Sequence, residues 1–156
     1  MWGEISSLES VKFFAPGVAR PQGSKKAFLN KRTGKPIYVE ASPHVKEWRS
    51  VIAASAGTVW KDRPLIEGKV CLQLTFCFLR PKNHYGTGKN AKILKPSAPQ
   101  DHLKAPDLDK LARAVLDALT NVCYRDDNQV VELELFKLWV TDRPGVQVCV
   151  WERYEP

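Results

Sequence analysis

The stretch from Lys69 to Leu79 constrains the fold most, because apolar side chains occur at every second position along it. In an extended chain, successive side chains point to opposite faces, so these apolar residues share one face. They are Val70, Leu72, Leu74, Phe76 and Phe78. The stretch therefore predicts a half-buried β-strand, which belongs to a sheet with one face against a core.

Two other stretches have apolar residues at helical spacing. The first runs from Pro43 to Ala56, where Ser42 is expected to cap the helix and Gly57 to end it. The second runs from Leu108 to Leu119, with apolar residues recurring at intervals of three and four. The sequence thus predicts two amphipathic helices on either side of the Lys69–Leu79 strand.

Four further stretches have the composition of strands: Val11 to Ala15, Ile37 to Val39, Val130 to Val140 and Val146 to Trp151. The last two are separated only by residues 141–145, which are typical of a hairpin turn, so we expect these strands to be neighbours. The fold class predicted is α+β, with a mixed β-sheet packed on two main helices. At 156 residues, the chain is expected to form a single domain, 1–156.

The cysteines and the hydropathy exclude several classes of protein. Cys71, Cys77, Cys123 and Cys149 have no CxxC spacing, which favours core thiols over zinc ligands or disulfides. No stretch approaches the roughly 18 apolar residues needed to span a membrane, and the first ten residues contain two glutamates and no apolar run. We expect a soluble cytoplasmic protein with no membrane partner.

The net charge of +7 is concentrated in two segments. The first basic segment, about 19–36, has six basic residues and no acidic one; the second, about 80–104, has six basic residues and one acidic one. Either segment alone is explained by a solvated surface, but two of them favour a polyanionic partner such as DNA. We expect both to be loops, because Gly and Pro interrupt them.

Four aspartates lie between and after these segments. Asp107 and Asp109 fall at the start of the second predicted helix, where helix capping explains them in ordinary terms. Asp126 and Asp127 precede a strand, where turn formation explains them equally well. The short return from helix to strand can instead bring the two pairs together, and such a cluster favours a hard divalent cation, with Mg²⁺ the natural occupant.

Two basic side chains accompany the aspartates. Arg113 lies one turn after Asp109, where it can contact a phosphate oxygen, or simply form a surface ion pair with Asp117. Lys137 shares a strand face with apolar residues, and we expect its ammonium group to extend to the end of the sheet.

These residues resemble the RusA-type Holliday junction resolvases. The likeness rests on residues 104–111, residues 114–119, the run Asp126-Asp127-Asn128-Gln129-Val130-Val131, and Lys137. It implies a small α+β homodimeric endonuclease that uses Mg²⁺ to cut opposed strands of a four-way DNA junction in recombination and repair. Mn²⁺ is the expected substitute, and the activity is expected to be nucleoid-associated.

The resemblance also implies roles for individual residues. The family's catalytic aspartates fall on Asp107, Asp109 and Asp127, which would also bind the metal, with Asp126 a further candidate ligand. Arg113 occupies the position of a family lysine, and phosphate binding is its expected role, because an arginine does not give up its proton at neutral pH.

The DNA-binding candidates are the cations of the basic segments and one lysine of the second helix: Arg20, Lys25, Lys26, Lys31, Arg32, Lys82, Lys89, Lys92, Lys95, Lys104 and Lys110. Two alternatives stay open. One is a flap or branched-DNA nuclease of the same fold, since branch geometry is recognised through shape. The other is a non-catalytic DNA-binding accessory module, in which the aspartates serve only capping and turn formation.

Overall fold

The structure, a computed structural model, describes residues 10–23, 25–40 and 42–154. Its main feature is a four-stranded sheet with the order β1 (Val11–Pro16), β6 (Gly145–Arg153), β4 (Lys69–Leu79) and β5 (Val130–Val140). β4 runs parallel to β5 and antiparallel to β6, and β1 runs antiparallel to β6. The predicted α+β class and mixed sheet are confirmed. The prediction about the first ten residues falls on residues 1–9, outside the described ranges, and on Ser10.

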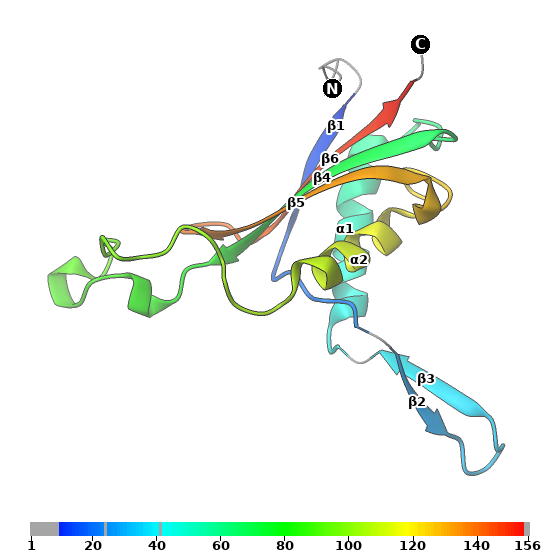
Figure 1. Ribbon diagram of the computed structural model, residues 1–156, viewed down its shortest axis with the longest axis horizontal. Helices are drawn as coiled ribbons and strands as arrows, with labels where there is room; N and C mark the ends of the chain where they lie inside the picture. Colours follow the sequence, from blue (N-terminus) through cyan, green and yellow to red (C-terminus); the bar gives the residue numbers. More distant parts are fainter. Residues whose placement is uncertain (1–9, 24, 41, 155–156) are drawn as a thin grey trace.

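Two helices cover one side of this sheet, α1 (Val45–Trp60) and α2 (Leu108–Leu119) (Figure 1). The alternation in β4 has the predicted effect, because Val70, Leu72, Leu74 and Phe76 are fully buried in the same core as both helices. The four cysteines are free, and all but the half-buried Cys77 are buried. This core fixes α2 against the sheet, and α2 carries three of the predicted site residues, Asp109, Lys110 and Arg113.

The predicted hairpin between the last two strands is wrong. β6 lies between β1 and β4, whereas β5 pairs with β4 at the edge of the sheet. The reason is burial: β6 is buried on both faces, with Val148 and Val150 in the main core and Cys149 and Trp151 in a second cluster on the opposite face. A strand that is apolar on both faces belongs inside a sheet, while β5, with Phe136 exposed, tolerates an edge.

The bounds of α1 also differ from the prediction. The helix starts after His44, which has a positive φ of 63°, and it continues past Gly57 to Trp60. Neither Ser42 nor Pro43 begins the helix. Trp60 is buried, and its indole Nε1 donates to the carbonyl of Pro64 at 3.2 Å. Burial of Trp60 outweighs the modest helix penalty of a glycine, so the helix runs one turn further than expected.

The first basic segment is not a loop throughout. It contains β2 (Lys25–Leu29), which pairs with β3 (Pro36–Glu40) to form a separate two-stranded sheet. At its tip, Asn30 accepts hydrogen bonds from the backbone of Arg32 and Thr33, and Gly34 has a positive φ of 67°. The β2–β3 hairpin projects away from the body of the molecule (Figure 1).

The second basic segment also projects from the body, in a different direction (Figure 1). It contains two short 3₁₀ turns, Lys82–His84 and Gly88–Asn90, and is otherwise irregular. Its ends are fixed to β5, because the rings of His84 and His102 lie 5.0 and 4.1 Å from the ring of Trp139. The segment is therefore anchored at both ends.

Candidate functional site

Asp107 and Asp109 lie in the surface-exposed first turn of α2. Asp107 occupies the N-cap position, and its backbone carbonyl accepts from Leu111 N at 3.1 Å, but its side chain forms no capping hydrogen bond. Its carboxylate instead contacts Lys110 Nζ at 3.1 Å. Side-chain capping therefore does not explain Asp107, whereas Asp109 still has the first-turn position that the helix dipole favours.

Lys137 fixes the backbone that leads into this turn. From β5, its Nζ donates to the carbonyls of Lys104 at 2.7 Å and Pro106 at 3.0 Å. The sequence predicts only that the Lys137 ammonium reaches the end of the sheet. In the structure, this ammonium ties β5 to the residues just before Asp107. The same segment is also joined to β5 where His102 N donates to the carbonyl of Lys137 at 3.3 Å.

The second pair of aspartates lies beyond the other end of α2. Asp126 caps a short 3₁₀ turn (Asp127–Gln129) and accepts from Asn128 N at 2.9 Å, so turn formation explains Asp126. Asp127, the first residue of this turn, is exposed. Some desolvation of its carboxyl, its hydrogen bond with Asp126, and the negative charges of Asp126 and Asp117 raise the pKa of the Asp127 carboxyl above its usual value.

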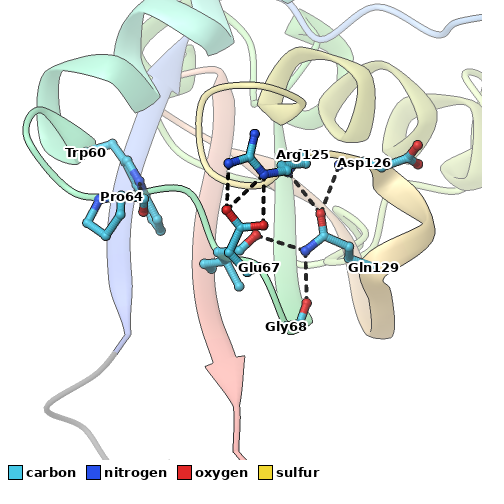
Figure 2. A network of polar contacts seen from close by, with 8 residues as sticks. Trp60, Pro64, Glu67, Gly68, Arg125, Asp126 and Gln129 are labelled. Atoms are coloured by element: carbon cyan, nitrogen blue, oxygen red, sulfur yellow. Dashed lines mark hydrogen bonds and ion pairs between the residues drawn. The ribbon is translucent and has the colours of Figure 1, made fainter.

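A polar network holds the Asp126–Asp127 turn in place (Figure 2). Gln129 donates from Nε2 to the carbonyls of Ile66 and Gly68, both at 2.9 Å, and its Oε1 accepts from the backbone of Arg125 and Asp126. Arg125 in turn pairs with Glu67 at 2.7 Å. Sequence reasoning missed Gln129 and Glu67, and the only available signal was the position of Gln129 directly after the aspartates.

The four aspartates are not gathered into one ready-made metal site. Within the described ranges, no group of three or more His, Cys, Asp or Glu side chains lies close enough together to hold a metal ion. The donors nevertheless fit Mg²⁺ in type, because this ion prefers oxygen ligands and commonly takes one or two carboxylates, with water and substrate phosphates completing its shell. The crowded charges that raise the pKa of Asp127 are also what a cation would relieve.

Arg113 is exposed on α2, one turn beyond Asp109. The alternative of an ion pair with Asp117 does not hold, because Arg113 takes part in none of the ion pairs among the residues that the structure describes. Asp117 instead accepts a hydrogen bond from Gln22 Nε2. The guanidinium of Arg113 is thus available to an external anion.

Gln22 and Arg49 connect the β2–β3 hairpin to the helices. Gln22 N donates to the carbonyl of Lys110 at 3.0 Å, which ties the chain before the hairpin to α2. Arg49 of α1 donates to Gln22 Oε1 at 2.7 Å and to Glu40 Oε1 at 3.0 Å. These contacts fix the base of the hairpin beside α2, and neither residue was predicted as part of the site.

The predicted DNA-binding cations lie on the two basic segments, and one, Lys110, lies on α2. All of them are exposed except Arg20, which is half-buried. The start of α2 lies between the two projecting basic segments (Figure 1). Burial and neighbouring cations lower the pKa of both His84 and His102 in the second segment, which disfavours their charged forms. The surface thus combines exposed carboxylates with cations on either side, as an enzyme acting on a polyanion requires.

Comparison with known proteins identifies the family. A family model described as endodeoxyribonuclease RusA matches residues 18–151, which include both helices and every predicted site residue. The chain belongs to the RusA endodeoxyribonuclease family. This RusA-family chain is also similar to YqaN of Bacillus subtilis (strain 168), an uncharacterised protein, at 28% identity over 150 residues that cover 93% of this chain and 98% of the relative.

The family match confirms the resemblance seen in the sequence and places the chain among endodeoxyribonucleases. Among the residues that the structure describes, no helix is both long enough and apolar enough to span a membrane.

Proposed function

We propose that this RusA-family protein is a magnesium-dependent endonuclease that resolves four-way DNA junctions by paired cuts, in DNA recombination and repair at the nucleoid. One observation carries the proposal: the exposed carboxylates of Asp107 and Asp109, at the start of α2, lie between two projecting basic segments. A branched DNA has phosphates on several sides of its centre, so two cationic segments that project in different directions fit it better than a single flat patch.

Each residue of the site has a role in this proposal. The Asp107, Asp109 and Asp127 carboxylates would hold the metal, with Asp126 at the side, and Mg²⁺ or Mn²⁺ would supply an activated water and Lewis acidity. Arg113, free of any carboxylate partner among the described residues, binds a phosphate oxygen near the scissile bond and stabilises its developing charge.

The supporting residues hold these groups in position. Lys137 fixes the approach to Asp107, and Gln129 fixes the turn that carries Asp127. The lysines of the basic segments bind the phosphate backbone without regard to base sequence. The active unit is a homodimer in this proposal, because resolution requires cuts on two opposed strands and one chain supplies one such site.

The test is cleavage of end-labelled DNA by the purified chain, with and without Mg²⁺, on a four-way junction, a flap and a duplex of matched sequence. We expect cleavage of the junction in Mg²⁺ and none in Asp107→Asn or Asp109→Asn, which should still bind the junction because loss of a negative charge reduces repulsion of phosphates. Asp62→Asn, an exposed aspartate after α1, is the matched control and should cut normally.

Three results would contradict the proposal. Preferential cutting of the flap would favour the flap nuclease. Binding of the junction with no cleavage, whichever metal ion is added, would favour the accessory module. Full activity of both aspartate variants would remove the start of α2 from the site.

A further inference from the structure

The β2–β3 hairpin exposes large apolar side chains that no part of the described chain covers. Every residue of β2 is exposed, and so are the first four of β3. The large apolar members are Phe28, Leu29, Ile37, Tyr38 and Val39. Tyr38 is 64% exposed and Phe28 is 56% exposed. Isolated two-stranded hairpins are marginally stable in water, and clustered exposed apolar side chains mark interaction surfaces.

Both faces of the hairpin carry these side chains. Phe28 pairs directly with Ile37, so these two residues share one face. Tyr38 pairs with Ala27, and Leu29 lies two residues further on the same side, so Tyr38 and Leu29 share the opposite face. Since neither face is covered, the hairpin is not a flap closed over the core. Its shape is that of a thin ribbon with an aromatic ring on each side.

The ribbon is fixed in direction at its base. Arg49 bonds both to Gln22, just before β2, and to Glu40, the last residue of β3. Gln22 is bonded to α2 through the carbonyl of Lys110. The base of the hairpin is therefore fixed to the first turn of α2, where the proposed catalytic carboxylates lie, and the hairpin projects away from it (Figure 1).

The charge on the hairpin identifies the kind of partner. Five exposed cations lie on its strands and turn, whereas its single carboxylate, Glu40, is paired with Arg49. The cations are Lys25, Lys26, Lys31, Arg32 and Lys35. Two such hairpins would repel each other, which argues against pairing between the hairpins of two copies of this chain. Cations combined with exposed aromatic rings instead match nucleic acid with unstacked bases, which offers phosphates and free π-faces.

We propose that the β2–β3 hairpin enters the open centre of a branched DNA, where Phe28 and Tyr38 stack on the exposed faces of unstacked bases and the hairpin cations hold the neighbouring phosphates. This inference rests on the proposed function and deepens it, because it names the element that distinguishes a branch point from a duplex. A duplex has no free base faces, so the rings gain nothing from it, whereas the cations bind both substrates.

The experiment measures binding in EDTA, where no cutting occurs, to a four-way junction and to a duplex of matched sequence. A 2-aminopurine placed at the branch point reports stacking. The variants are Phe28→Thr and Tyr38→Thr, which keep strand propensity, with Tyr38→Phe to retain the ring and Val59→Thr on α1 as the control. Circular dichroism and light scattering show whether each variant keeps its fold and its oligomeric state.

We expect each threonine variant to lose about tenfold in junction affinity, within the range of one base–aromatic stack, and to leave duplex affinity unchanged. The 2-aminopurine signal should change with the wild type, Tyr38→Phe and Val59→Thr, and not with a double variant that carries both Phe28→Thr and Tyr38→Thr.

Three results would overturn the inference. One is an unchanged preference for the junction in the double variant. Another is an equal loss of affinity on the junction and the duplex. The third is dissociation of a wild-type dimer on substitution, which would make a second copy the occupant. A wild-type protein that binds junction and duplex equally would instead contradict the proposed function, and this inference with it.

Discussion

Replacing Lys137 with methionine tests whether the backbone before Asp107 must be held in place. The substitution keeps most of the side chain's packing and removes the ammonium that donates to the carbonyls of Lys104 and Pro106. Each such charged hydrogen bond contributes about 1.5–3 kcal/mol when well shielded, and partial solvent access reduces this, so we expect a total loss of about 2 kcal/mol. For a chain of this length, that loss lowers Tm by about 4–8 °C.

The effect on catalysis should exceed the effect on stability. If the approach to α2 relaxes, the Asp107 carboxylate shifts, and a misplacement of about 1 Å costs on the order of 100-fold in rate. The assay is single-turnover cleavage of a four-way junction in Mg²⁺, at a temperature where the variant is fully folded, together with junction binding in EDTA. We expect the cleavage rate to fall about 100-fold and binding to stay close to the wild type.

Two companion variants make this result specific. Lys12→Met removes an exposed lysine on β1, with the same change of charge, and should cut normally. Lys137→Arg retains a donor and should recover part of the rate. If Lys137→Met cuts at the wild-type rate while its Tm falls as expected, Lys137 only stabilises the fold and the positioning role is refuted.

Two further predictions follow from charge. Because the folded state raises the pKa of Asp127, its ionisation disfavours folding, and this destabilisation is present above its folded pKa and absent below the unfolded value of about 3.9. Asp127→Asn should therefore raise Tm at pH 7 but not at pH 3, and an equal gain at both values would exclude charge as the cause. Junction affinity should fall steeply with added salt, and replacing Lys31 and Arg32 by glutamine should reduce the slope of log K against log[salt] by about two; an unchanged slope would remove the hairpin tip from the phosphate contacts.

The elements that the sequence predicts well are those with a local pattern. The alternation in β4 and the apolar stripe of α2 each lie within one short stretch, so their bounds agree with the structure. β6 shows the limit of this reasoning. Its apolar residues lie on both faces of the strand, which is typical of an internal strand, but this becomes apparent only when the two faces are compared. β2 was missed because its lysines and its exposure give no core-facing pattern.

The candidate site was predictable in the same uneven way. Asp107 lies just before one helical stretch and Asp109 and Arg113 lie within it, and the exposure of Asp109 and Arg113 on α2 follows from its period. The residues that hold the site were not predictable, because their contacts span the chain. Gln129 bonds to residues more than 60 positions earlier, and Arg49 joins two segments that only the folded chain brings together.

Paired cutting of a cruciform tests the central claim most directly. A supercoiled plasmid with an inverted repeat extrudes a four-way junction, and two coordinated cuts across it convert the circle to a linear molecule. We expect the wild-type protein in Mg²⁺ to produce linear plasmid without an accumulated nicked circle, and Asp109→Asn to produce neither. Nicked circles as the lasting product, or equal cutting of a plasmid without the repeat, would contradict the assignment of this RusA-family chain as a junction resolvase.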